Sequence, residues 1–269
     1  MKRAGLYLLA VLAALLIALP LLLMLLNSLK SSVEVQGGFL ALPREPSFAA
    51  WRQAWAQLSG SFAASLMLAV PAVLLSAVLA AVNGFVLCKY RFRGERWVGL
   101  ALVLAFFLPI KVYLLPLAIT MARLGLERSL PLLIGIHVIY SLPLALFFRN
   151  HFLAFPDELL QAARLDGAGF WRLLWRVVLP LSKPIFVVVL ILQFTTIWNE
   201  YLFGLVFGPD GARPITAALA QLSAQTETGA RAYPLEMAAA LLAAAPTLVV
   251  YLLAGRHFTR GLVAGAVKG

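Results

Sequence analysis

Few side chains in this sequence have the type and spacing that chemistry requires. Glu200, in the run WNEYL, is the single acid of a long apolar stretch, and Lys111 is the single base of another. Ionisable groups at membrane depth are destabilising unless they face a cavity or a partner. Glu200 is therefore interpreted either as part of a substrate pathway, with Gln193 and Asn199, or as a structural pairing at a helix or subunit interface. Lys111 presents the same choice, or its long side chain reaches toward the interface.

Covalent catalysis and metal binding receive little support. His137, His151 and His257 lack the spacing of metal ligands, and the single Cys88 excludes an internal disulfide. A membrane enzyme would need paired acids or a nucleophile and base within the apolar stretches. No Gly-Lys dipeptide occurs, so the phosphate loop G-x-x-x-x-G-K-[ST] is absent. We predict a chain that is not an enzyme and binds no metal or cofactor.

The composition places the chain in the membrane class. Its 269 residues are 62% hydrophobic and 12% charged, whereas soluble domains average about 25% charged residues. The net charge of +11 comes mainly from short loops between apolar runs, where basic residues act as topology signals and do not indicate nucleic acid. We predict one integral membrane domain over residues 1–269.

Six stretches are long and apolar enough to cross a bilayer, which takes about 20 residues. They cover residues 6–29, 61–88, 97–122, 130–148, 184–207 and 237–255. Two intervening loops, 31–60 and 208–234, are polar; the first contains Trp51 and Trp55 at the spacing of a short interfacial helix. The second opens with GPDG, a turn signal.

Basic residues predict the orientation. With the N-terminus in the cytoplasm, fourteen lysines and arginines lie in inside segments and seven in outside segments. The positive-inside rule therefore favours cytoplasmic termini and a multi-pass protein of the cell membrane.

One long polar segment, residues 155–184, separates the fourth and fifth stretches and lies on the cytoplasmic side in this orientation. Pro156, Asp157 and Glu158 are typical of a helix start, and the Asp-Gly pair at 166–167 indicates a turn. A second amphipathic helix follows, which we expect Pro180 and Pro184 to end. The pattern predicts a helix–turn–helix. By itself it fits a docking surface or a helix lying on lipid headgroups.

The amino-acid sequence of this segment resembles the EAA loop of ABC-importer permeases. That pattern reads roughly EAA, three residues, G, nine residues, then I or L, x, L, P. The matching residues are Ala162, Ala163, Asp166, Gly167, Ala168, Leu179 and Pro180. TIWNEYLFGLVF (196–207) is similar to the fifth span of the sugar-type permeases, and RHFTRGLVAGAVKG (256–269) to the tail of the maltose-type second permease subunit. SLKSSVEV and FAAWRQAW resemble that subgroup's first external loop.

The resemblance implies the type I ABC-importer permease architecture, all-α, with six transmembrane helices and a core over residues 61–255. The segment 155–184 would couple this core to a separate ATPase dimer that binds ATP and Mg. The resemblance further implies a second permease subunit, an external solute-binding protein, surrounding lipid and a carbohydrate cargo. Trp198 would then stack on a sugar ring, although anchoring at the interface explains it equally.

One departure from the family pattern concerns the leading acid, which is Gln161 here. A salt bridge from this position to the ATPase becomes at most a neutral hydrogen bond, and Glu158, one turn earlier, is a candidate replacement. Two alternative functions stay open. One is the same machine importing glycerol 3-phosphate or another polyol derivative, and the other is a secondary transporter that couples protons through Glu200.

Overall fold

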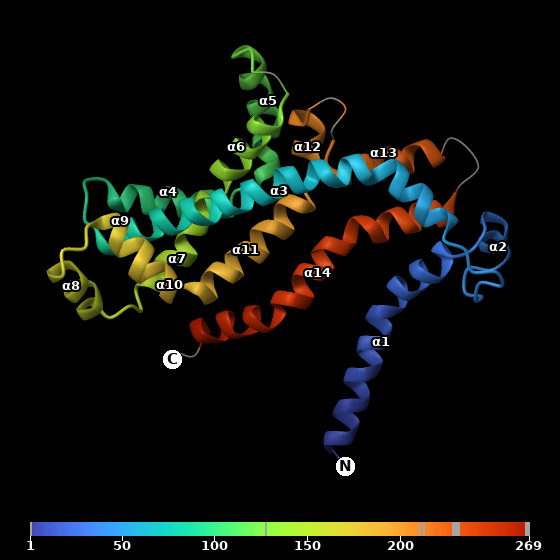
Figure 1. The fold of residues 1–269 in the computed structure, drawn as a ribbon, viewed down its shortest axis with the longest axis horizontal. Helices are drawn as coiled ribbons and strands as arrows, with labels where there is room; N and C mark the ends of the chain where they lie inside the picture. The colour runs from blue at the N-terminus through green and yellow to red at the C-terminus, as the bar shows by residue number, and fades with distance from the viewer. Residues whose placement is uncertain (1, 127, 210, 212, 228–231, 267–269) are drawn as a thin grey trace. The chain divides into compact units, whose positions relative to one another are not determined.

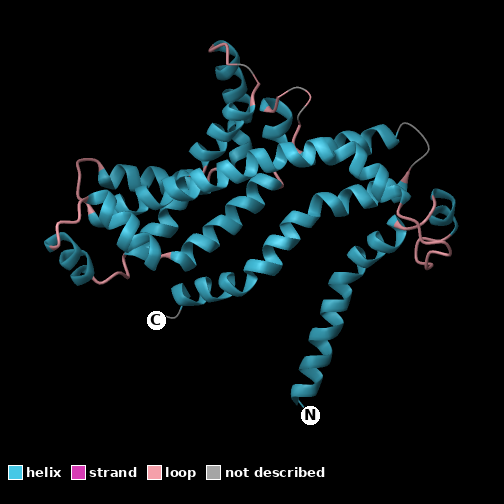
Figure 2. Cartoon of the chain, viewed as in Figure 1, coloured by secondary structure: helices cyan, strands magenta, loops and turns pink. Residues whose placement is uncertain are grey.

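The computed structural model describes residues 2–126, 128–209, 211, 213–227 and 232–266. Over these residues the secondary structure consists of helices joined by loops and turns, with no strand (Figure 2). Asp210 of the GPDG turn and the last three residues of the C-terminal tail lie outside the described residues. The prediction of an all-α fold is confirmed.

The helices follow one another through short connections. The first half contains α1 (Lys2–Ser28), α2 (Ser32–Gly37), α3 (Ala49–Lys89), α4 (Glu95–Phe107), η1 (Ile110–Tyr113), α5 (Leu114–Arg123), α6 (Leu130–Tyr140), η2 (Leu142–Leu144) and α7 (Ala145–Phe152). The second half contains α8 (Asp157–Leu165), α9 (Phe170–Leu173), η3 (Leu174–Val178), α10 (Leu179–Leu181), α11 (Lys183–Trp198), α12 (Leu202–Phe207), α13 (Ile215–Glu227) and α14 (Tyr233–Ala266).

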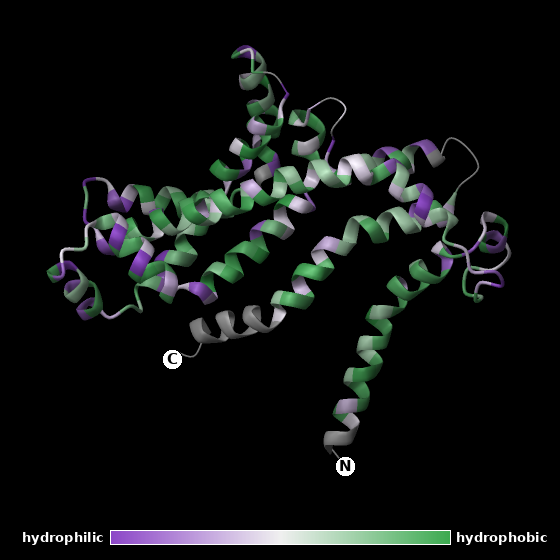
Figure 3. Ribbon diagram, in the orientation of Figure 1, coloured by the Kyte–Doolittle hydropathy of each residue, from purple (hydrophilic) through white to green (hydrophobic). Residues whose placement is uncertain are grey.

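Four of these helical stretches are long and apolar enough to cross a membrane. They are residues 5–28, 49–89, 130–152 and 233–255. Two bent pairs raise the number to six if each pair forms one span. The apolar character of α1 and the polar character of α8 are visible in Figure 3. The chain is therefore a multi-pass membrane protein.

The second span is longer than predicted. The short interfacial helix expected around Trp51 and Trp55 is wrong, because α3 runs unbroken for 41 residues. Pro71 lies inside it without ending it, since in a packed membrane helix neighbouring groups re-satisfy the backbone that proline disrupts. The loop 208–234 likewise contains a helix, α13, which its polar composition did not reveal.

The third and fifth predicted spans are not continuous. α4 and the helical stretch 111–123 meet at 92°, and the break coincides with Pro109, whose ring disfavours helical backbone at Leu108. α11 ends at Trp198, and α12 begins only at Leu202. Broken helices of this kind are tolerated at membrane depth where they are buried in protein or line a cavity.

The chain divides into two compact units. The first comprises residues 1–63 and 215–246, and its core joins the N-terminal part of α3 to α13 and α14 through Ala54, Leu58, Leu222 and Leu235. The second comprises residues 64–214 and 247–269. Its core contains the alanine-rich C-terminal half of α3, which packs against α7 and the polar segment (Figure 1).

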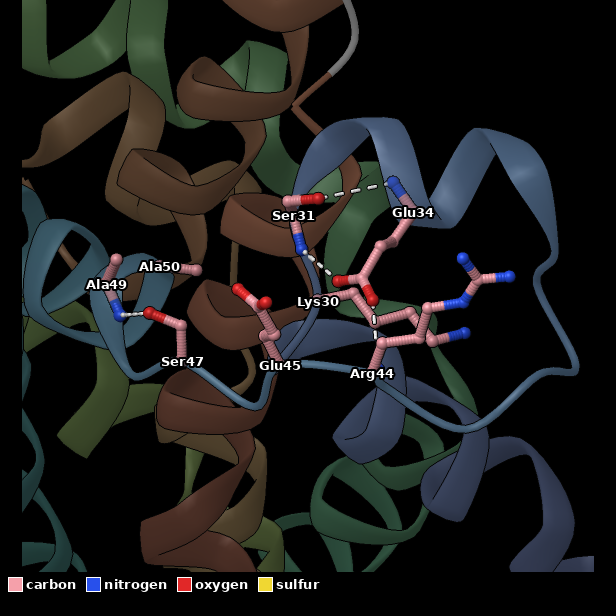
Figure 4. Close-up of a pocket in the computed structure, with 8 residues that line it drawn as sticks. All are labelled: Lys30, Ser31, Glu34, Arg44, Glu45, Ser47, Ala49 and Ala50. Atoms are coloured by element: carbon pink, nitrogen blue, oxygen red, sulfur yellow. Dashed lines mark hydrogen bonds between the residues drawn. The ribbon is translucent and has the colours of Figure 1, made fainter.

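In the first unit, residues 30–48 form a loop closed by its own hydrogen bonds, which we call the capped loop. The buried Lys30 ammonium donates to Asn27 Oδ1 and to the Gly38 carbonyl, both at 2.9 Å. Ser31 and Glu34 form a capping box at the start of α2, and Glu34 Oε1 accepts the Arg44 amide at 2.9 Å. Lys30, Ser31, Glu34 and Arg44 line a cavity of about 430 Å³ (Figure 4).

The capped loop should loosen in acid. The backbone amides of Arg44 and Ser31 donate to the Glu34 carboxylate, and they lower its pKa below the ordinary 4.5. A lowered pKa means that the carboxylate contributes stability above pH 4.5 and loses it as the pH falls through the folded-state value. Amide hydrogen exchange at Arg44 should therefore lose protection below pH 4.5, whereas Glu34→Gln should show no such step. If protection of the Arg44 amide in the wild type stayed constant as the pH fell below 4.5, the stabilising role of the Glu34 carboxylate would be contradicted.

Candidate functional site

The polar segment begins with α8, whose first turn contacts the last residue of α3 and whose last turn contacts the residue that follows α3. Lys89 Nζ lies 2.7 Å from Asp157 Oδ1 in the first turn of α8. The Arg164 guanidinium, in the last turn, lies 5.7 Å from the centre of the Tyr90 ring. Asp157 at the N-terminus and Arg164 at the C-terminus also complement the helix dipole. α8 is therefore held beside the end of α3 (Figure 1).

The turn after α8 requires glycine at position 167. Gly167 has φ +77°, in the left-handed region. The Ala168 amide donates to the Ala163 carbonyl at 2.9 Å, and the Gly167 amide donates to the Arg164 carbonyl at 3.0 Å. This pair of bonds is the Schellman arrangement that ends helices at a left-handed residue. The predicted Asp-Gly turn thus has a specific backbone basis.

Replacing Gly167 by alanine should destabilise this turn by about 1 kcal/mol. The cost comes from the positive φ alone, because an added Cβ would meet no atom within 4 Å. Gly169→Ala is the matched control, since Gly169 has equal space and an extended backbone with φ −71°. Limited proteolysis across residues 165–170 should accelerate for Gly167→Ala only. Equal rates in the two variants would contradict the role of the turn.

The second helix of the polar segment runs from Phe170 to Leu181, past Pro180. The helix ends between Pro180 and Pro184, as expected, although Pro180 itself lies inside the helical run. A π-helical turn, η3, precedes the proline, and such a turn relieves the contact between a proline ring and the carbonyl four residues earlier. The chain then turns by 83° into α11, and Ser182 Oγ hydrogen-bonds the Val178 carbonyl at this corner.

An apolar face anchors the polar segment in the core of the second unit. Leu160, Leu173, Leu174 and Val178 are at most 4% exposed. They belong to the same cluster as the buried aromatic residues of α3 and α7, which are Phe85, Phe148 and Phe152. Burying a leucine contributes about 1.5–3 kcal/mol, so the segment is packed firmly against the spanning helices and is not a free linker.

The opposite face of the segment is exposed. Glu158, Gln161, Ala162, Asp166 and Gly167 are exposed, while Ala163 and Ala168 are half-buried. Near the end of the segment, Leu179 is half-buried and Pro180 is exposed. No hydrogen bond of the Glu158 or Gln161 side chain is found within the described part of the chain.

Sequence reasoning missed Leu165, an apolar side chain that is 89% exposed at the end of α8. Its signal was available, because a helix turns about 100° per residue and Leu165 therefore lies about 140° around α8 from the buried Leu160. Leu165 is therefore an exposed apolar side chain on the face of α8 that is turned away from the core.

Gln193, one of the predicted pathway residues, lines a cavity. It is 7% exposed, and its Nε2 lies 3.3 Å from Ser76 Oγ. The cavity of about 500 Å³ lies between α4, α6 and α11, and Tyr113, Tyr140 and Thr196 also line it. The two tyrosine rings are 5.5 Å apart.

The other predicted pathway residues have local structural partners. Trp198 is 1% exposed and stacks on Phe194 at 5.5 Å. The Asn199 amide donates to the Thr195 carbonyl at 2.9 Å. Glu200 accepts backbone amides of the first turn of α12, from Leu202, Phe203 and Gly204, at 2.8–3.1 Å. A carboxylate at a helix N-terminus is stabilising, so Glu200 caps α12.

No set of three histidine, cysteine or acidic residues within the described ranges is placed to hold a metal ion.

Comparison with known proteins identifies the family. The sequence profile of the binding-protein-dependent transport system inner membrane component matches residues 46–263. A probable ABC transporter permease of Pyrococcus horikoshii is 40% identical over 69% of this chain and 68% of its own length. The xylose/arabinose import permease XacI of Haloferax volcanii is 34% identical over 77% and 73% of the two chains. The melibiose/raffinose/stachyose import permease MelC of Bacillus subtilis is 29% identical over 93% and 91%.

A solved structure shares the fold. One chain of a bacterial ABC transporter involved in import of the acidic polysaccharide alginate superposes with a TM-score of 0.78, covering 96% of each chain at 22% identity. With the sequence profile covering most of the chain, this protein belongs to the family of binding-protein-dependent transport system inner membrane components.

Proposed function

We propose that the chain is a transmembrane permease subunit of an ATP-driven, binding-protein-dependent sugar importer. The observation that carries this proposal is the polar segment, which is anchored in the core of the spanning helices on one face and exposes Leu165 on the other. Through its buried contacts, the polar segment would transmit a movement of a docked partner to the spanning helices.

The cargo class follows from the relatives and from the cavity. Named relatives import xylose and arabinose, diacetylchitobiose, or melibiose, raffinose and stachyose. The described residues lining the cavity at Gln193 include aromatic rings, an amide and hydroxyls, and no lysine or arginine. A mostly apolar lining with aromatic rings and a few hydroxyls suits a neutral sugar, whereas a phosphorylated polyol would favour basic groups. This favours sugar over glycerol 3-phosphate.

The partners of the proposed importer are a second permease subunit, a dimer of ATPase subunits and an external solute-binding protein. ATP and Mg would bind the ATPase, and no cofactor would bind this chain. A bacterial alginate transporter of the same fold is known in complex with a periplasmic protein bound to alginate pentasaccharide. In the proposed orientation both termini and the polar segment are cytoplasmic, as the excess of basic residues in those segments favours.

The proposed mechanism is alternating access. Closure of the ATPase dimer on ATP would displace α8, and its buried contacts would carry the displacement to α3, α7 and α11. Glu158 and Gln161, together with the small residues Ala162, Ala163, Asp166, Gly167 and Ala168, would form the docking face. Leu179 and Pro180 would position the corner before α11. The substrate pathway is predicted to include Gln193, Trp198, Asn199 and Glu200.

Reconstitution tests this function. The chain, its sister permease and the ATPase are placed in liposomes with the binding protein, and radiolabelled sugar uptake is measured. Uptake should require ATP and the binding protein, and a protonophore should leave it unchanged. Uptake that proceeds without the ATPase and collapses with the protonophore would instead support the secondary transporter. Glu200→Gln, which preserves an acceptor for the α12 amides, should keep most of the uptake.

A further inference from the structure

A cavity of about 710 Å³ lies in the second unit, where the loop between α3 and α4 meets α7. Three arginines line it: Arg91 from the loop, Arg96 from the first turn of α4, and Arg149 from α7. Glu95 is the one acid among its lining residues, so the cavity carries two net positive charges. Within the described ranges, none of these three arginines forms an ion pair. The cavity is thus a cationic site whose single acid only partly offsets its three arginines.

The start of α4 adds to the attraction for an anion. Gly94, the residue that caps this helix, has no side chain to accept the first amides, and its φ is +92°. Free amides at a helix N-terminus carry partial positive charge and favour anions. This partial charge adds to the positive charge of the three arginines, which is the larger contribution.

The lining is amphipathic, with apolar side chains at its buried end and basic and aromatic side chains at its exposed rim. Its buried member Leu87 is 6% exposed, and Leu146 is half-buried. Arg91, Arg96 and Trp97 are exposed, and Trp97 is 72% exposed. Beyond the cavity the outer face of α4 continues with Leu100 and Leu104, which are 46% and 55% exposed. A basic and aromatic rim over an apolar floor, next to a helix face suited to hydrocarbon, matches the membrane interface.

We propose that this cavity binds the phosphate-bearing head group of an anionic phospholipid. The arginines would contact the phosphate oxygens with charge-assisted hydrogen bonds, and Leu87, Leu146 and the outer face of α4 would contact the first part of the acyl chains. Basic pockets between membrane helices recognise such head groups. Free phosphate shares the charge chemistry but has nothing to place on the apolar floor.

The test uses the full chain purified in detergent and measures its thermal unfolding with added lipid. Palmitoyl-oleoyl phosphatidylglycerol should raise the unfolding midpoint of the wild type, whereas the phosphatidylcholine of the same chains should not. Arg96→Gln should raise the phosphatidylglycerol concentration for half-maximal effect about tenfold, by loss of one charge-assisted contact. Arg91→Gln should behave alike. Both side chains are exposed, so neither change threatens the fold.

Arg93→Gln is the matched control. Arg93 belongs to the same loop and is exposed, but it does not line the cavity, so its half-maximal concentration should stay within about twofold. If Arg93→Gln and Arg96→Gln raised the half-maximal phosphatidylglycerol concentration equally, the lipid would be attracted by surface charge in general. That result would contradict a site at the cavity. An equal shift with phosphatidylcholine would also overturn it. An equal shift with inorganic phosphate alone would assign the cavity to free phosphate instead of lipid.

Discussion

Leu165→Asp is expected to weaken binding of the ATPase to this chain about ten- to a hundredfold. Leu165 is 89% exposed and lies on the face of α8 opposite the buried Leu160. A leucine that becomes buried on docking contributes about 1.5–3 kcal/mol, which corresponds to this range in Kd. The chain itself should fold normally, because the side chain makes little contact within it. Titration of purified ATPase against the detergent-solubilised permease complex measures the change.

Leu40→Asp is the control for this change. Leu40 is also an exposed leucine, at 77%, but it belongs to the capped loop. The same substitution there should leave ATPase affinity unchanged. Full ATPase affinity in Leu165→Asp would contradict the docking role of the polar segment, and so would an equal loss in both variants.

Gly84→Ala is expected to destabilise the second unit by about 1–3 kcal/mol or more. A Cβ at Gly84 would lie 2.6 Å from Phe148 Cβ, 2.7 Å from the Ala145 carbonyl oxygen and 2.9 Å from the Arg149 amide nitrogen. Two of these atoms are α7 backbone, so a side-chain rotation cannot relieve the contact. Small residues let membrane helices approach this closely. The displacement of α7 would reach Phe148 and Phe152, against which the polar segment packs.

Gly60→Ala provides the comparison on the same helix. An added Cβ at Gly60 would meet nothing within 4 Å, and alanine is a better helix former than glycine by up to about 1 kcal/mol. Heating the detergent-solubilised protein and measuring the surviving monodisperse fraction should show a lower midpoint for Gly84→Ala and an unchanged or higher midpoint for Gly60→Ala. Equal unfolding midpoints for the two variants would contradict the close contact between α3 and α7 at Gly84.

The sequence predicted the features that depend on local composition. Apolar runs located the spanning helices, because about 20 apolar residues are needed to cross a bilayer, and Asp166 with Gly167 located the turn. It did not predict where helices break or continue. Pro71 and Pro180 lie inside helical runs, while the chain breaks near Pro109 and after Trp198. Identical residue types behave differently here because tertiary contacts decide whether freed backbone groups are satisfied.

The residues of the candidate site likewise include some that the sequence predicted and some that it did not. Residues of the polar segment were found through their pattern, since a family motif occupies fixed positions in the sequence. Glu200 could be flagged as an unusual acid, but its role as a cap of α12 depends on a helix break that the apolar run concealed. The close approach at Gly84 could not be predicted, because neither stretch alone shows that helices cross between residues 84 and 145–149.

The central claim is that the polar segment docks on a separate ATPase. A photo-crosslinking amino acid at position 165 tests it most directly, in membrane vesicles that contain the whole importer, with position 40 as the comparison. Irradiation should give an adduct of this chain with the ATPase from position 165 and none from position 40. Absence of an ATPase adduct at position 165, in vesicles that still import sugar with ATP, would contradict the account.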